Sequence, residues 1–227
     1  MKDLLLITPP FTQLNTPYPA TAYLKGFLNT KGIAAFQMDL GIEVILELFS
    51  KVGLASIFEK ASIDGVSENA QRIFGLKQDY IQTIEEVIAF LQGRKPTLAR
   101  QICSGNFLPQ ASRFSQENDL EWAFGNMGMQ DKAKHLATLY LEDLSDFIVE
   151  CLDENFGFSR YAERLGRSAN SFDELYGHLQ KQPTFIDEIT LRILNQKLEE
   201  IQPKLVCFSV PFPGNLYSAF RCAGYIK

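Results

Sequence analysis

"LLLITPPFTQLNTPYPATAYLKGFLNTKG", at positions 4–32, determines the fold that we expect for this chain. Residues 4–7 form an uninterrupted apolar run, which is typical of a strand buried on both faces in a parallel sheet. Two prolines and a polar loop follow. Apolar residues then recur at helical spacing until Gly32, which suits a left-handed helix stop. We expect Thr16 or Thr21 to cap this helix.

Two further apolar runs complete the predicted sheet. Residues 33–38 read as a second strand that ends at Asp39, so residues 4–39 form a βαβ unit with parallel strands. Residues 205–210 read as a third strand, and "PFPGN" leads from it into a last helix that opens near Asn215. We predict an α/β fold with a Rossmann-like or flavodoxin-like parallel sheet, in strand order 2-1-3 and truncated after the third strand.

Between the second and third strands the pattern is almost purely helical. Residues 42–58, 80–91, 132–152 and 185–201 carry apolar side chains at three- and four-residue steps, and Ser171 with Glu174 reads as a capping box. A parallel crossover needs only about a dozen residues. We therefore assign 42–202 to a helical insert subdomain, and 1–41 plus 203–227 to the α/β part.

The composition excludes several classes of protein. The chain is 46% hydrophobic and 22% charged, so it is globular, and its net charge of −5 argues against nucleic acid as the main partner. It has no run of 18 apolar residues that could span a membrane, and no signal-peptide pattern at its start. Four widely spaced cysteines fit reduced thiols better than disulfides, so we expect a cytoplasmic protein.

The candidate binding site consists of the two proline-rich loops that follow the first and third strands. Ligands of open parallel sheets bind at the carboxyl ends of the strands, where the strand order reverses. The loops hold no His, Arg or Lys, and they form neither a dinucleotide fingerprint nor a P-loop. We therefore expect a large polar ligand bound by hydroxyl, amide and backbone groups. The candidates are Thr8, Pro9, Pro10, Thr12, Gln13, Asn15, Thr16, Ser209, Pro211, Gly214 and Asn215.

A structural explanation of the same loops stays open. Two consecutive prolines can simply end a strand, because proline has no backbone N–H to donate to a sheet. Asn215 can simply cap the helix that follows it. For any single residue, a purely structural role explains the sequence as well as a binding role does. For the two loops taken together, the structural explanation is the weaker one.

The stretch at 4–33, the following "FQMDL" and the late "LVCFSVPFPGNLYSAFRCAGYIK" together resemble the N-terminal cobalamin-binding domain of cobalamin-dependent radical SAM enzymes. The resemblance covers about 60 residues, on the scale of a small domain. It implies a Rossmann-like cobalamin-binding module, and it adds Asp39, at the end of the second strand, to the candidate residues. It also implies a downstream domain that carries a 4Fe-4S cluster and S-adenosylmethionine.

The chain departs from this family's pattern in two ways. Its cysteines lack the Cys-x-x-x-Cys-x-x-Cys spacing of the cluster domain, so we expect neither a metal site nor a catalytic residue in this fragment. The loop after the first strand lacks Asp-x-His-x-x-Gly, and both histidines, His135 and His178, lie in the insert. Bound cobalamin would therefore have no histidine as its lower ligand.

Two other functions remain open from the sequence. The helical insert could be a protein-interaction domain on an α/β scaffold, or the chain could be a flavodoxin-like or nucleotide-sugar enzyme domain. We expect the chain to be part of a longer protein. The third strand would then be bare, covered by the insert, or paired with a second copy in a dimer formed through 205–210.

Overall fold

The computed structural model describes residues 2–12, 14, 16–119, 128–158 and 172–227. The chain divides into two compact units, one made of 1–45 with 155–227 and one made of 46–154. The first unit holds the sheet, and the second is helical throughout the part that is described.

Three parallel strands form the sheet, which confirms the predicted order. They are β1 (Lys2–Thr8), β2 (Ala35–Asp39) and β3 (Pro203–Phe208), and β1 lies in the middle. The register pairs Leu4 with Ala35 on one side and with Leu205 on the other. The continuous apolar run of β1 is explained by this central place, because Leu5 and Ile7 are both 0% exposed.

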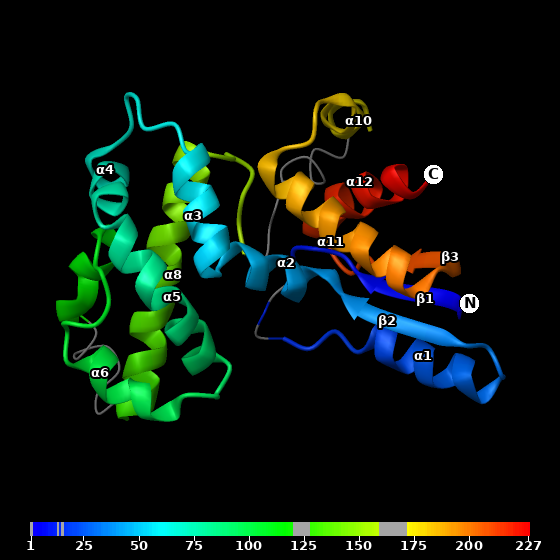
Figure 1. Cartoon of the computed structure of the whole chain (residues 1–227), viewed down its shortest axis with the longest axis horizontal. Helices are drawn as coiled ribbons and strands as arrows, with labels where there is room; N and C mark the ends of the chain where they lie inside the picture. The colour runs from blue at the N-terminus through cyan, green and yellow to red at the C-terminus, as the bar shows by residue number, and fades with distance from the viewer. Residues whose placement is uncertain (1, 13, 15, 120–127, 159–171) are drawn as a thin grey trace. The chain divides into compact units, whose positions relative to one another are not determined.

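Among the described residues, five helices belong wholly or partly to the sheet unit. They are α1 (Ala20–Thr30), α2 (Leu40–Leu48, which continues into the helical unit), α10 (Asp173–Gln180), α11 (Phe185–Ile201) and α12 (Leu216–Ile226). Figure 1 shows α1 next to β2, and α12 beside α11. None of the described helices is both long enough and apolar enough to cross a membrane.

Of the two helix-end signals predicted for α1, the structure confirms the stop and contradicts the cap. Gly32 has φ 75°, as a left-handed stop requires, so this expectation is confirmed. The expected threonine cap is wrong: the residue before the helix is Pro19, and no side chain caps it. Thr21 lies inside the first turn, where the backbone N–H of Tyr23 donates to the carbonyl of Pro19 at 2.9 Å.

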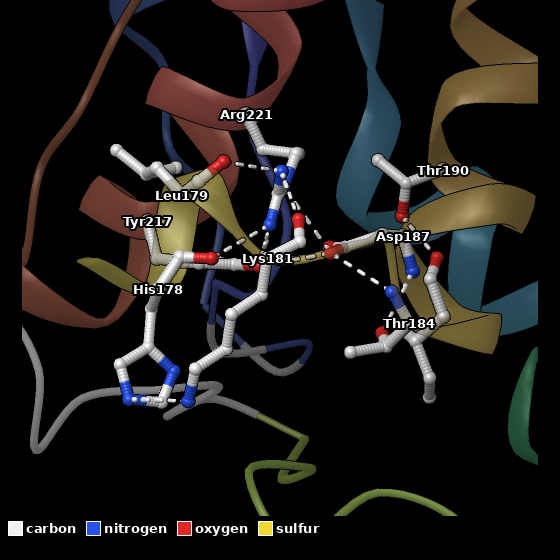
Figure 2. A network of polar contacts seen from close by, with 9 residues as sticks. His178, Leu179, Lys181, Thr184, Asp187, Thr190, Tyr217 and Arg221 are labelled. Carbon is white, nitrogen blue, oxygen red and sulfur yellow. Dashed lines mark hydrogen bonds and ion pairs between the residues drawn. The ribbon is translucent and has the colours of Figure 1, made fainter. Parts of the chain in front are cut away.

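The sheet unit includes residues 155–202, which the sequence pattern had assigned to the insert. The reason is a polar network between α11 and α12 (Figure 2). Asp187 of α11 is 3% exposed and accepts a hydrogen bond from the hydroxyl of Tyr217 of α12 at 2.9 Å. Arg221 lies 3.3 Å from the same carboxylate. Its guanidinium also donates to the carbonyls of Leu179 and His178, at the end of α10.

Asp187 has a second role at the start of α11. Thr184 and Asp187 form a capping box, in which each side chain accepts a hydrogen bond from the other's backbone N–H at 3.2 Å. The sequence pattern had placed a capping box at Ser171 and Glu174, of which Ser171 lies outside the described residues. Phe172, directly before α10, makes no side-chain cap.

The helical unit has a core of its own. Its described helices are α3 (Lys51–Lys60), α4 (Glu68–Gly75), α5 (Lys77–Leu91), α6 (Ala99–Cys103) and α8 (Met129–Cys151), with 3-10 turns at Pro96–Leu98 and Ser112–Asp119. The segment 42–58, expected as one helix, is two, because the Ser50 hydroxyl accepts from the backbone N–H of Gly53 at 2.9 Å and starts α3. Tyr80, Tyr140 and Phe147 are fully buried between these helices.

Candidate functional site

The carboxyl edge of the sheet brings the ends of all three strands together. Thr8 and Asp39 are register partners at the ends of β1 and β2. On the other side, the backbone N–H of Ser209, directly after β3, donates to the carbonyl of Ile7 at 2.9 Å. The loops that follow β1 and β3 therefore start side by side, as the strand order predicts.

The two loops also meet farther from the strands. The ring of Tyr18, in the loop before α1, lies edge-on to the ring of Phe212, in the loop before α12, with centroids 5.6 Å apart and planes at 78°. Pairs of aromatic rings in this geometry contribute about 0.5–1.5 kcal/mol beyond the area that they bury. This contact joins the loop after β1 to the loop after β3, as the site predicted from the sequence requires.

A third segment joins the first loop at the start of α2. A Cβ built on Gly41 would lie 3.3 Å from Asp39 Oδ1, 3.4 Å from Thr12 Oγ1 and 3.5 Å from the Cα of Pro10. Thr12, Asp39 and the backbone of Pro10 therefore surround Gly41 closely. Glycine allows this approach because it has no side chain.

Asp39 is engaged by the backbone of α2. Its Oδ1 accepts a hydrogen bond from the backbone N–H of Ile42 at 3.0 Å. Burial raises the pKa of the Asp39 carboxyl, although backbone hydrogen bonds from Ile42 and Gly41 oppose this shift. The hydrogen bond at the helix start gives Asp39 a structural task besides its predicted role in binding.

The predicted site residues differ widely in exposure. Thr8, Pro9, Pro10, Thr12, Gly214 and Asn215 are buried, Asp39 and Ser209 are half-buried, and Thr16 and Pro211 are exposed. Gln13 and Asn15 lie outside the described residues. The loops are thus placed together, while the binding role of each residue stays a prediction.

Asn215 has the most unusual environment of these residues. It is 0% exposed, directly before α12 and at the end of a 3-10 turn, Pro213–Asn215. Its side chain makes no cap bond to the helix, and both Oδ1 and Nδ2 are buried without a hydrogen-bond partner. A buried polar group left unpaired costs about 1–3 kcal/mol. The folded chain therefore places an expensive, unused donor and acceptor at the carboxyl edge of the sheet.

Tyr18 adds a second group of this kind. Its hydroxyl is buried and has no hydrogen-bond partner, although its ring packs on Phe212. Neither Tyr18 nor Phe212 is among the site residues predicted from the sequence. The signal available was an aromatic residue in each of two polar loops, and only the structure brings the two rings together.

The buried or paired charged side chains of the helical unit make contacts that stabilise its fold. Asp143 is 0% exposed and accepts backbone hydrogen bonds from Ala111 at 2.9 Å and Arg113 at 3.1 Å. Burial raises the pKa of its carboxyl. The side chain of Arg113 pairs with both carboxylate oxygens of Asp146 at 2.7 Å. These contacts fasten the 3-10 turn that begins at residue 112 to α8.

Within the described ranges, no three His, Cys, Asp or Glu side chains gather in a geometry that could hold a metal ion. Comparison with known proteins finds no matching protein-family model, no matching curated protein and no matching solved structure. The functional conclusion therefore depends on the residues and geometry of the chain itself.

Proposed function

We propose that the sheet unit is a Rossmann-like cobalamin-binding module of a radical SAM iron–sulfur enzyme. The observation that carries the proposal is the meeting of two uncharged, polar loops at the carboxyl edge of β1 and β3, through Tyr18 and Phe212. This edge is the usual place for a cofactor in an open parallel sheet. The resemblance of the same two segments to cobalamin-binding domains supplies the identity of the cofactor.

The residues at this edge suit a large ligand that is bound through neutral polar groups. Thr8 and Thr12 are 2% and 3% exposed, and Asn215 and Tyr18 offer buried polar groups with no partner. These four residues would hold and orient the cofactor. Cobalamin, when bound, supplies carbon–cobalt bond chemistry that side chains do not provide. The cluster and S-adenosylmethionine would belong to a downstream domain, and we propose that the protein works in the cytoplasm.

Reconstitution with hydroxocobalamin tests the proposal. The intact protein is incubated with hydroxocobalamin or, separately, with FMN, and each ligand that stays bound after gel filtration is quantified. We expect stoichiometric retention of cobalamin. Failure of both ligands to stay bound would favour a protein-interaction domain. Retention of FMN alone would favour a flavodoxin-like domain.

The lower ligand of cobalt can be tested in the same sample. We expect no histidine on cobalt, because no loop at the candidate site contains one. The reduced Co(II) form is compared by electron paramagnetic resonance with and without ¹⁵N-labelled histidine. The spectra should be identical, and a change in nitrogen hyperfine splitting would contradict the proposed binding mode.

The proposal extends to the protein's partners, which would be its own radical SAM domain and a second copy of the chain. In the described residues β3 pairs only with β1, and Leu205 in the middle of β3 is 55% exposed. An unpaired apolar edge favours pairing with another strand. Light scattering should show a dimer that Leu205→Lys weakens, and a wild-type chain that is strictly monomeric at all concentrations would exclude the second copy.

A further inference from the structure

The amide of Asn215 sets a chemical requirement on what binds beside it. An asparagine directly before a helix usually accepts a hydrogen bond from a backbone N–H in the first turn. Asn215 does not, and its backbone N–H already donates to the carbonyl of Phe212 at 3.0 Å. Its side chain therefore keeps one acceptor, Oδ1, and one donor group, Nδ2, both buried and both without a partner.

Only some ligand groups can satisfy both atoms together. A carboxylate or a phosphate dianion offers acceptors, which would pair with Nδ2 but leave Oδ1 unpaired. An ammonium group offers donors and leaves Nδ2 unpaired. A carboxamide has an N–H and a C=O side by side, so it can form two parallel hydrogen bonds with an asparagine side chain.

We propose that Asn215 binds a carboxamide of the ligand through a pair of hydrogen bonds, and so selects amide-bearing ligands over the corresponding acids. The inference rests on the proposed function for the ligand's identity, since the corrin ring of cobalamin carries acetamide and propionamide side chains. The preference for an amide over the corresponding acid or amine is argued from the two unpaired atoms of Asn215 and does not depend on which amide-bearing ligand occupies the site.

Tyr18 lies on the same pair of loops and has an unpaired group of its own. Its ring contacts Phe212, whose carbonyl holds the backbone of Asn215, so the two residues are linked through one neighbour. Its buried hydroxyl can donate one hydrogen bond and accept another. A ligand rich in amides can satisfy this group as well, whereas an apolar ligand would leave both residues unpaired.

The first test compares Asn215→Leu with wild type. Leucine has nearly the same shape and no polar atoms, so the ligand-free variant should unfold at a higher temperature than wild type. Its affinity for hydroxocobalamin should fall at least tenfold. The matched control is Asn106→Leu at an exposed position, which should change neither property. An unchanged affinity of the Asn215→Leu variant would overturn the proposal, and so would an unfolding temperature no higher than that of wild type, because the amide would then already have a partner such as water.

A second test needs neither a variant nor cobalamin. The side-chain ¹⁵N resonance of Asn215 is followed while propionamide or propionate is added to wild type at tens of millimolar. Propionamide should shift the Nδ2 signal and propionate should not. A shift with propionamide in a protein that fails to bind hydroxocobalamin would reject the cobalamin proposal and keep this one. Equal shifts with both probes, or no shift with either, would overturn it.

Discussion

Tyr18 and Phe212 lie 194 positions apart in the chain, yet their rings meet edge to face with centroids 5.6 Å apart. Each residue belongs to the loop that follows a strand, and the two strands are neighbours in the sheet. The two loops therefore contact each other beyond the ends of the strands. The contact joins the loops that follow β1 and β3 at the carboxyl edge of the sheet.

This ring pair predicts different results for two substitutions. Tyr18→Phe keeps the ring and removes an unpaired buried hydroxyl, so the free energy of unfolding should stay equal or rise by about 1 kcal/mol. Phe212→Ala removes the contact and should lower it by about 1 kcal/mol or more. Chemical denaturation measures both. Tyr23→Phe, on a side chain that is 76% exposed, is the matched control and should have no effect. A loss of stability in Tyr18→Phe would mean that the hydroxyl has a partner.

The raised pKa of Asp39 predicts a pH dependence. The folded state holds this proton more tightly than the unfolded chain does, so the group's contribution to stability is largest at low pH. This contribution is lost as the pH rises from the ordinary aspartate pKa through the raised one. Asp39→Asn cannot ionise and can still accept the hydrogen bond from Ile42. The stability of this variant relative to wild type should therefore rise with pH across that window.

Denaturation at a series of pH values measures this difference. Asp64→Asn removes a carboxyl at an exposed position and serves as the control. A difference between Asp39→Asn and wild type that falls as the pH rises would contradict the direction of the shift.

Arg221 connects α10, α11 and α12, so we expect its loss to lower the free energy of unfolding. Its side chain is nearly buried and pairs with the buried carboxylate of Asp187. The Tyr217 hydroxyl donates to this carboxylate, and burial raises the pKa of Tyr217 to about 12. Arg221→Met leaves the carboxylate without its cation, so unfolding should become easier by about 3 kcal/mol. Arg100→Met, at an exposed position, should be nearly neutral. A similar small effect in both variants would show that the network contributes little.

Two glycines of the helical unit predict opposite effects of the same substitution. A Cβ on Gly53 would overlap the carbonyl oxygens of Glu47 and Leu48, so Gly53→Ala should destabilise the unit by about 3 kcal/mol or more. A Cβ on Gly75 would meet nothing within 4 Å, so Gly75→Ala should be neutral or stabilise α4 by about 0.5–1 kcal/mol. Thermal unfolding of both variants measures these changes. Equal effects would contradict the close approach of Gly53 to the carbonyl oxygens of Glu47 and Leu48.

The strands and their order could be predicted because they depend on local patterns. A continuous apolar run such as Leu4–Ile7 fits a central parallel strand and little else, and the right-handed crossover rule then limits the order. The place of α11 could not be predicted in the same way. Its periodicity shows that one face is buried, but not that Asp187 pairs with Tyr217 and Arg221 in the last helix. The split of the 42–58 segment depends on a single hydroxyl, that of Ser50.

The meeting of the two loops could be predicted from the sequence, but the polar environment of their side chains could not. Proline-rich polar loops after two neighbouring strands indicate a binding edge. Whether Asn215 caps its helix or stays unpaired depends on rotamers and on burial by residues far away in the chain. The sequence favours capping for an asparagine in this position, and the structure shows no cap bond. The same is true of Tyr18, whose buried hydroxyl is visible only in the folded chain.

The proposed ligand binds at the loops after β1 and β3, and hydrogen–deuterium exchange measures whether these loops are protected by it. Exchange is measured on the intact protein with and without saturating hydroxocobalamin. We expect slower exchange in peptides covering 8–12 and 209–215, with no change in α5 or α8 of the helical unit. Slower exchange confined to residues 46–154, with the two loops unaffected, would contradict this binding site.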